Sequence, residues 1–187
     1  GNEHEMQLRK YLKYKVNIIS KQPVFFNTGQ KDFILPRKKF ITVFDLTPGR
    51  PIFRKSNLFQ EFYSSDMIIK FVSDLIEISQ KNNVTLILKT KRINNLTDKK
   101  YINFLNKEIT KKRLLLIKND ISSISLIRKS KLIISYPFTS TSQLANYFKI
   151  QNYYYCPAKF EFSNHVLLGS KILYNKKDLN KVLSKNL

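Results

Sequence analysis

The chain has a single cysteine, Cys156, and two histidines, His4 and His165. One thiol cannot form an internal disulfide, which suits a reducing compartment. The histidines are far apart and no cysteine accompanies them at metal-ligand spacing, so no metal site is expected. Unbroken apolar runs such as Leu114 to Ile117 are too short for a transmembrane helix, and no signal peptide is visible. We therefore expect a cytoplasmic protein.

Acidic residues are also scarce. The 187 residues include 13 Asp and Glu against 34 Lys and Arg, which leaves a formal net charge of +21. Such an excess favours an anionic partner, and nucleic acid, an anionic membrane face and a sugar nucleotide all qualify. Compositional drift is the other explanation, because Lys, Asn, Ile and Tyr are all abundant, as in proteins from AT-rich genomes. A chain of this length fits one domain, with or without an attached flank.

Short β-rich segments alternate with segments of helical periodicity along most of the chain. Residues 1–36 lie outside this alternation, and we interpret them as an N-terminal flank or the remnant of a preceding domain. Strands are predicted at 40–44, 84–88, 114–117, 132–134, 153–155 and 171–174. Helices are predicted at 65–82, around 101–109, at 120–129, after 140 and around 179–183. Because parallel strands need crossover connections, residues 37–187 are predicted to form an α/β domain with a doubly wound, Rossmann-like parallel sheet.

Residues that directly follow the predicted strands are the first candidates for a site, because ligands of open parallel sheets bind beyond the carboxyl ends of the strands. Asp45 follows the first strand. Lys89, Lys91 and Arg92 follow the second, and residues 136–141 follow the fourth. Cations, hydroxyls and one acid are therefore expected at one edge of the sheet.

The helix start at residues 137–142 is the strongest local signal. Free backbone N–H groups, the positive end of the helix dipole and several hydroxyls together suit a phosphate group, although a Gly-rich phosphate loop is absent. Ser140 and Gln143 fit a capping box, so capping explains part of the hydroxyl content. Asp120 is likewise expected to cap the start of the helix predicted at 120–129. Four consecutive hydroxyl residues exceed what capping needs, which favours ligand binding.

The run from Ile133 to Thr141, followed by Ala145, resembles the signature of polysaccharide biosynthesis proteins that carry a Pro-Phe-Thr-Ser (PFTS) motif. The segment 120–129 and the strand end at 44–45 resemble the same family, so the similarity covers roughly residues 40–183. Proteins of this family are similar to GT-B glycosyltransferases that use CMP-Kdo or CMP-sialic acid. The resemblance implies the C-terminal, donor-binding half of a glycosyltransferase that builds bacterial capsule or lipopolysaccharide.

The same resemblance implies partners and roles for the site residues. The donor would be a CMP-activated sugar such as Kdo or a sialic-acid-like sugar, and the acceptor a glycan or a lipid-linked glycan. Lys89, Lys91 and Arg92 would offset the charge that builds as the glycosidic bond breaks, and no metal or other cofactor is required. The residues that would surround the nucleotide and its phosphate are Tyr136, Pro137, Thr139, Ser140, Thr141 and Ser142.

Two departures from that group affect the interpretation. Sialyltransferase-like relatives place a His-Pro pair where this chain has residues 89–92, so a cation would have to neutralise the phosphate here. The N-terminal Rossmann-like domain that commonly binds the acceptor and supplies a base or nucleophile is incomplete. We therefore expect the chain to bind a donor without turning it over by itself.

Each candidate also has a structural explanation. The Lys-Arg cluster can be a solvated basic face. Asp45 can be a general base, a ribose ligand or a cap for the following turn, and we favour the cap. Tyr136 can stack on a base, although a tyrosine packed at a strand end is more common.

Two other functions remain open. Basic clusters at 37–39, 111–113 and 128–129, beside many tyrosines, would suit a nucleic-acid-binding Rossmann-like module. They fall in different elements without a helix-turn-helix or RNA-binding signature, which makes nucleic acid the weaker candidate. The charge could also hold the protein on an anionic membrane, peripheral at the inner membrane, where lipid-linked acceptors reside.

Overall fold

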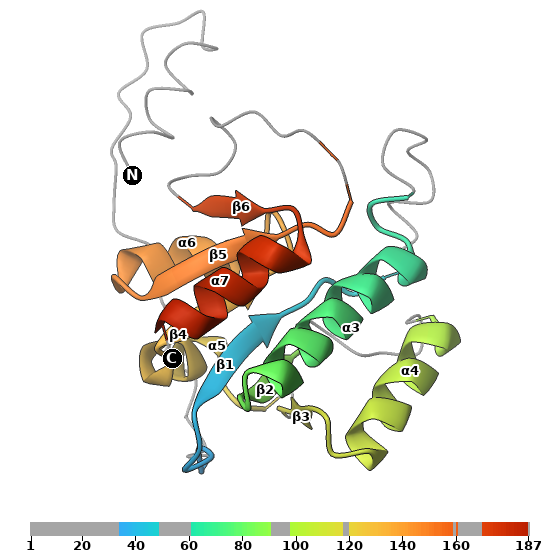
Figure 1. Cartoon of the computed structure of the whole chain (residues 1–187), viewed down its shortest axis with the longest axis horizontal. Coiled ribbons are helices and arrows are strands. Elements are labelled where there is room, and N and C mark those ends of the chain that lie inside the picture. The colour runs from blue at the N-terminus through green and yellow to red at the C-terminus, as the bar shows by residue number, and fades with distance from the viewer. Residues whose placement is uncertain are drawn as a thin grey trace, which may run out of the picture.

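The structure is a computed structural model (Figure 1) that describes residues 34–48, 61–90, 98–117, 120–158, 160 and 170–186. Nearly all of the expected N-terminal flank, as well as Lys91 and Arg92, lies outside the described residues. The interpretation of residues 1–36 as a flank therefore stays a prediction.

A six-stranded, fully parallel sheet forms the centre of the structure. Its strands are β1 (Phe40–Phe44), β2 (Thr85–Lys89), β3 (Leu115–Leu116), β4 (Leu132–Ser135), β5 (Gln151–Tyr155) and β6 (Lys171–Leu173). They lie in the order β3-β2-β1-β4-β5-β6, which is the strand order of the Rossmann fold. The predicted fold class is confirmed, and the direction of strand addition reverses between β1 and β4.

Helices cover both faces of the sheet. They are α3 (Ser65–Lys81), α4 (Lys99–Thr110), α5 (Ser123–Lys129), α6 (Ser140–Tyr147) and α7 (Lys176–Asn186). In Figure 1, α3, α4 and α7 lie on the near face, and α5 and α6 on the far face. This arrangement is doubly wound, because the chain changes face when it crosses from β3 to β4.

Each central strand contributes side chains to two separate cores. In β1, Val43 packs in the core beneath α3, α4 and α7, whereas its neighbour Phe44 packs in the core beneath α5 and α6. Leu88 and Ile87 of β2 divide in the same way. Strands that are buried on both faces consist almost entirely of apolar residues. The apolar run at 84–88 therefore allowed β2 to be predicted from the sequence.

Strand β3 differs from the prediction of a buried strand at 114–117. It consists of Leu115 and Leu116, and the side chain of Leu115 is 42% exposed. Only Leu114 and Ile117, on either side of the strand, are buried. Among the described strands it lies at the edge of the sheet and pairs only with β2, and an apolar run does not reveal whether its strand is central or at an edge.

Three helices end with a non-glycine residue in the left-handed region, in a chain that has only four glycines. Asn83, Lys112 and Lys149 follow α3, α4 and α6 with φ of 53°, 55° and 57°. The next amide then donates to a carbonyl five residues earlier, as in a Schellman motif. These bonds are Val84 N to Ser79 O (2.9 Å), Arg113 N to Glu108 O (3.0 Å) and Ile150 N to Ala145 O (2.9 Å).

The start of α5 corrects one prediction. Its N-cap is Ser122, so Asp120 lies two residues too early to cap the helix as expected. By contrast, α3 begins with a conventional cap, in which the hydroxyl of Ser64 accepts a 3.2 Å bond from the amide of Met67.

A buried carboxylate joins α3, β5 and α7. The hydroxyl of Tyr155 donates a 2.7 Å hydrogen bond to Asp74, and the ammonium of Lys176 lies 3.1 Å from the other carboxylate oxygen. Burial, followed by this hydrogen bond, raises the pKa of Tyr155. The carboxylate therefore retains a donor and a cation in a place where an unpaired charge would be costly.

We predict that the free energy of unfolding falls as pH rises above 10. Burial raises the pKa of Tyr101, Tyr136 and Tyr155 above the ordinary value of 10.0. The unfolded chain then loses phenolic protons that the folded chain keeps, so the stabilisation is complete below pH 10 and is lost above it. Each such proton contributes about 1.4 kcal/mol per pH unit to the slope.

Urea titrations at several pH values above about 9 would measure this slope, with Tyr155→Phe compared to the wild type. In Tyr155→Phe, the free energy of unfolding should fall with pH by about 1.4 kcal/mol per pH unit less than in the wild type, because one phenolic proton is missing. Tyr147→Phe, at an exposed tyrosine, controls for the loss of a phenol. Equal slopes in Tyr155→Phe and the wild type would contradict the prediction.

Candidate functional site

The expected site segments converge where the strand order reverses. Phe44, the last residue of β1, is in register with Lys89 of β2 on one side and with Ser135 of β4 on the other. Neighbouring strands are about 4.8 Å apart, so the ends of β2 and β4 are separated by about 10 Å. The structure thus brings Asp45, Lys89 and the segment after β4 to one edge, as predicted, at the position where α/β sheets bind ligands.

The first turn of α6 begins at this edge without a side-chain cap. Its N-cap is Thr139, and among the described residues no side chain accepts a capping hydrogen bond from the turn. The hydroxyl of Thr139 instead donates a 3.0 Å bond to the carbonyl of Tyr136. The capping box expected from Ser140 and Gln143 is therefore wrong, since the helix starts one residue before it would apply. The amide of Ser142 donates a 3.3 Å bond to the carbonyl of Thr139, whereas the amides of Ser140 and Thr141 keep their capacity to donate to a ligand.

The four consecutive hydroxyl residues divide into two groups. Thr139 and Ser142 are buried, whereas Ser140 is exposed and Thr141 is partly exposed. Thr141 donates a 3.0 Å hydrogen bond to the hydroxyl of Thr139 and lies 3.3 Å from that of Ser135. Ser140 and Thr141 are therefore the hydroxyls that a ligand at this edge could reach.

Ser142 belongs to a polar network that fixes α6 to the sheet. Its hydroxyl donates to Asn152 of β5 and lies 2.9 Å from the hydroxyl of Ser170, just before β6. Asn146, one turn further along α6, donates to Ser170 (2.9 Å) and accepts from Asn152 (2.6 Å). Ser142 thus has a structural role, and it positions the helix start rather than reaching the edge.

Phe138 occupies a strained backbone position directly before α6. Its φ of 65° places it in the left-handed region. Among the described residues other than glycine, it is the one in this region that does not directly follow a helix. The preceding Pro137 is buried, whereas the Phe138 side chain is 37% exposed, with its ring 6.1 Å from that of Phe62 and 6.4 Å from that of Tyr154. An exposed aromatic ring is therefore held beside the helix start.

Tyr136 is enclosed in the core rather than open to a ligand. Its hydroxyl donates a 2.6 Å bond to the carbonyl of Phe62, and its ring meets that of Phe71 edge-on at 5.2 Å. Burial is the main cause that raises the pKa of this phenol. The structure confirms the expectation that Tyr136 is packed at the end of its strand. The Tyr136 ring could stack on a base only by leaving the core.

Lys89 is a buried cation on the α6 side of the sheet. Its side chain follows the alternation of Ile87, which packs beneath α5 and α6, and the residue is 6% exposed. Burial lowers the pKa of Lys89, and the negative charge of Asp120 partly opposes this shift. Asp120, which was expected to cap α5, thus contributes to the electrostatics of the edge. A cation in such surroundings acts more strongly on a nearby anion than one in water.

Asp45 lies on the opposite side of the sheet and is held by a residue that the sequence did not indicate. It is 2% exposed, and the hydroxyl of Tyr101, on α4, donates to its carboxylate. Burial first, and then the charge of Asp45, raise the pKa of Tyr101 well above its ordinary value. Tyr101 occupied an apolar position of a predicted helix, so its hydroxyl gave no signal. This contact ties α4 to the end of β1 and suits a positioning role for Asp45.

We predict that Ser142→Ala and Ser140→Ala have different effects on stability. Ser142→Ala removes two hydrogen bonds from a buried network in which Ser170 still donates to Asn152 (2.9 Å), and should lower the free energy of unfolding by about 1–2 kcal/mol. Ser140→Ala, at an exposed position, should change it by less than about 0.5 kcal/mol. Chemical denaturation of both variants would test this division, which equal losses would refute.

Comparison with solved structures identifies proteins of similar fold. UDP-GlcNAc 2-epimerase of Methanocaldococcus jannaschii, in complex with UDP-GlcNAc and UDP, has a TM-score of 0.53 and 17% identity, over 80% of this chain and 39% of that chain. Another structure of this epimerase gives a TM-score of 0.52 and 16% identity, over 78% of this chain and 38% of that one. This chain therefore spans less than half the length of either structure.

Comparison of the sequence with known families gives a more specific result. No curated protein matches the chain. The model of the family described as polysaccharide biosynthesis PFTS motif protein matches residues 4–183, which is almost the whole sequence. The motif residues of that name are Pro137, Phe138, Thr139 and Ser140, which form the strained turn and the uncapped start of α6. The chain belongs to the polysaccharide biosynthesis PFTS motif protein family.

Proposed function

We propose that this chain is the donor-binding part of a glycosyltransferase in surface polysaccharide biosynthesis, and that it holds the phosphate of a nucleotide sugar at the start of α6. The carrying observation is the helix start itself. It lies where the strand order reverses, it lacks a side-chain cap within the described residues, and it exposes Ser140. A phosphate is the ligand that such a helix end favours.

The placement of the surrounding groups supports this proposal. Thr141 and Ser135 carry hydroxyls 3.3 Å apart at the end of β4, and Lys89 lies two strands away on the same side of the sheet. A phosphate at the start of α6 would receive backbone amides and a hydroxyl directly, and would lie in the field of the Lys89 ammonium. The epimerases of similar fold include one in complex with UDP-GlcNAc and UDP, which fits a sugar nucleotide as the ligand class.

The chemistry of glycosyl transfer explains why these groups would matter. When the glycosidic bond of a nucleotide sugar breaks, negative charge builds on the phosphate oxygen that leaves. Amides fixed by a helix, together with a cation in a poorly solvated place, stabilise that charge without reorganising. Amides of Ser140 and Thr141 would bind the phosphate, and Lys89 would offset part of the developing charge.

The nucleotide and the catalytic base belong to the proposal as well. The PFTS motif at this position favours a CMP-activated sugar, such as Kdo or a sialic-acid-like sugar, and the fold comparison makes a UDP-sugar the principal competitor. Because Tyr101 holds Asp45 away from the α6 side, we assign Asp45 to positioning. The base, and the residues that bind the acceptor glycan or lipid-linked glycan, would then belong to parts of the enzyme outside the described segments.

We predict that the chain binds a nucleotide and that Ser140→Asp abolishes this binding without unfolding the protein. The new carboxylate would lie in the first turn of α6, where the helix dipole favours an acid but where it repels a phosphate. Titration calorimetry with CMP, CDP, UDP and GDP would measure the affinity. Selective binding of one nucleotide would also identify the donor class.

Two variants control this experiment. Ser140→Ala removes only the hydroxyl and should weaken binding by about tenfold, since one hydrogen bond to a charged group contributes about 1.5 kcal/mol. Ser73→Asp adds the same negative charge on an exposed position of α3 and should leave the affinity unchanged. Nucleotide binding by Ser140→Asp at the wild-type affinity would refute the phosphate site.

We also predict that Lys89→Met weakens nucleotide binding more than it destabilises the fold. Methionine can fill the space of the buried aliphatic stem without its charge, so the loss should appear as an affinity reduced by about tenfold and as a weaker dependence on salt. Lys89→Arg, which keeps the charge, is the matched comparison. Unchanged affinity in Lys89→Met would separate this cation from the proposed site.

A further inference from the structure

The amino edge of the sheet, opposite the candidate nucleotide site, exposes a second concentration of charge. Residues 37–39 precede β1, residues 111–113 precede β3, and Lys131 precedes β4. All seven residues are Lys or Arg, and all are exposed. We call this set the basic edge. It includes two of the three basic clusters that stood out in the sequence, and the fold brings them together.

Acidic side chains gather at the opposite edge instead. Asp66 and Asp178 lie in the first turns of α3 and α7, Asp98 is the N-cap of α4, and Asp120 precedes α5. Helices that return from parallel strands begin at the carboxyl edge of the sheet, so these acids lie far from the basic edge. Lys99, Lys100, Lys176 and Lys177 begin α4 and α7 at that same edge, so both signs of charge occur there, whereas the basic edge holds seven exposed cations.

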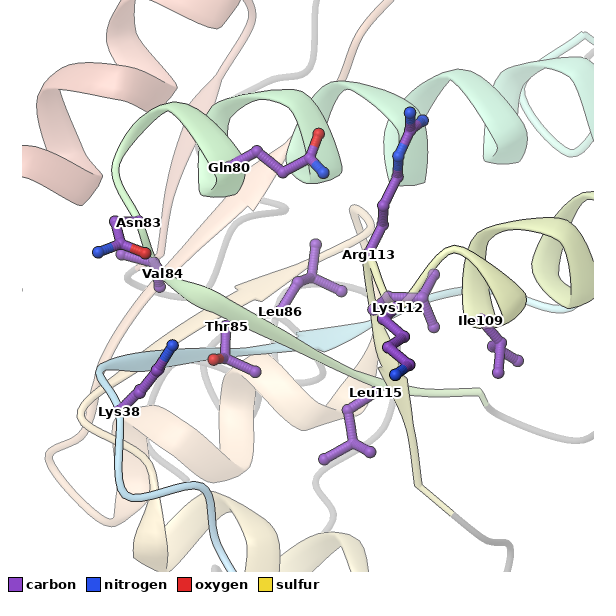
Figure 2. Close-up of a pocket in the computed structure, with 11 residues that line it drawn as sticks. Lys38, Gln80, Asn83, Val84, Thr85, Leu86, Ile109, Lys112, Arg113 and Leu115 are labelled. Carbon is purple, nitrogen blue, oxygen red and sulfur yellow. The ribbon is translucent and has the colours of Figure 1, made fainter.

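A cavity of about 530 Å³ opens within the basic edge (Figure 2). Lys38 lies on one side of it, and Lys112 and Arg113 lie on the other, with Leu86 between them. Leu115, the exposed residue of β3, also lines it. Cations on two sides of a lining that also contains aliphatic side chains suit a ligand that joins an anionic group to an apolar body.

The cations of this cavity are incompletely neutralised. Arg113 lies 3.3 Å from the carboxylate of Glu108, which is buried beneath it. In the segments that the structure describes, neither Lys38 nor Lys112 forms an ion pair with an acid. A second cavity of about 280 Å³, lined by Lys38, Lys39 and Lys131, continues the positive surface toward β4.

Helix dipoles explain only part of this charge. Cations stabilise the carboxyl ends of helices, and residues 111–113 follow α4 just as Lys131 follows α5. Residues 37–39 lead into a strand and follow no helix of the described segments, so this explanation does not cover them. They also supply Lys38, which lines both cavities.

Exposed aliphatic side chains favour a lipid surface over nucleic acid as the partner. Ile34, close in sequence to residues 37–39, is 96% exposed, and Leu115 extends from the cavity wall into solvent. An anionic bilayer interacts favourably with both the cations and the aliphatic side chains, because interfacial binding combines electrostatic attraction with buried apolar area. A nucleic acid would interact favourably with the cations at these positions but not with the exposed aliphatic side chains.

We infer that the basic edge docks on an anionic lipid bilayer and that the cavity between Lys38 and Lys112 receives a lipid phosphate. The nucleotide site at the opposite edge then faces away from the membrane and stays open to a soluble donor. This inference goes beyond the proposed function and does not depend on it, since it concerns a different edge and different residues.

Co-sedimentation with vesicles tests this inference on the full chain. Vesicles of phosphatidylcholine with phosphatidylglycerol should retain the protein, and vesicles of phosphatidylcholine alone should not. The double variant Lys38→Gln with Lys112→Asn should reduce partitioning by roughly 30-fold, because each basic side chain near an anionic surface contributes about fivefold. Asn is chosen at position 112 because it tolerates the left-handed backbone there.

A matched double variant removes the same charge elsewhere. Lys70→Gln with Lys177→Gln changes two exposed lysines on the outer surfaces of α3 and α7, and it should bind vesicles nearly as well as the wild type. Thermal unfolding of both double variants, compared with the wild type, verifies that neither has lost its fold. Equal losses in the two double variants would show that net charge alone causes binding and would overturn the cavity as a lipid site.

Other partners give distinguishable results. A short DNA duplex that binds more tightly than the anionic vesicles at the same salt concentration, and loses binding in Lys38→Gln with Lys112→Asn, would make the basic edge a nucleic-acid interface and overturn the inference. Binding of soluble glycerol phosphate without retention on vesicles would assign the cavity to a free phosphate ester, and would also overturn it. Retention on anionic vesicles that only the first double variant loses would support it.

Discussion

All six strands of the sheet are parallel, and this constraint determines where each kind of chemistry can lie. Every helix that connects such strands starts at the carboxyl edge and ends at the amino edge. One edge therefore collects helix starts, with their free amides, and the other collects helix ends, with their free carbonyls. The reversal of strand order beside β1 leaves a position at the first edge where one helix start, that of α6, can meet a ligand.

The strands that the sequence predicts best are those in which the local apolar pattern and the burial agree. Strands β2 and β4 are buried on both faces, so their continuous apolar runs predicted both the strands and the parallel sheet. The same reasoning overestimated the strand at 114–117, because an edge strand needs fewer buried residues than its apolar run suggests. Helix starts were less predictable, since Asp120 and Ser140 have suitable cap side chains but lie at the wrong positions relative to the first turn. A one-residue difference in the start decides which side chain can cap.

The candidate site was predictable in location but only partly in composition. The predicted alternation of strands and helices placed Lys89 and the start of α6 at the same edge of the sheet. The register of Phe44 with Lys89 and Ser135 confirms this placement. The distinction between Ser140 and Ser142 did not follow, because both are serines at one helix start and only the packing of α6 on β5 and β6 separates them. The contact between Tyr101 and Asp45 joins residues 56 positions apart, and no local pattern encodes such a pair.

The large positive charge takes on a different meaning once its distribution is known. Compositional drift can explain how many lysines a chain has, but it gives no reason for seven exposed cations to lie at one edge of the sheet. Helix dipoles supply one reason, since acids are favoured at helix starts and bases at helix ends. The helix dipole accounts for Asp66 at the start of α3 and for Lys112 at the end of α4, but not for the basic residues that precede β1. Those residues belong to the part of the net charge that helix dipoles leave unexplained, and they lie at the edge where a binding surface has been inferred.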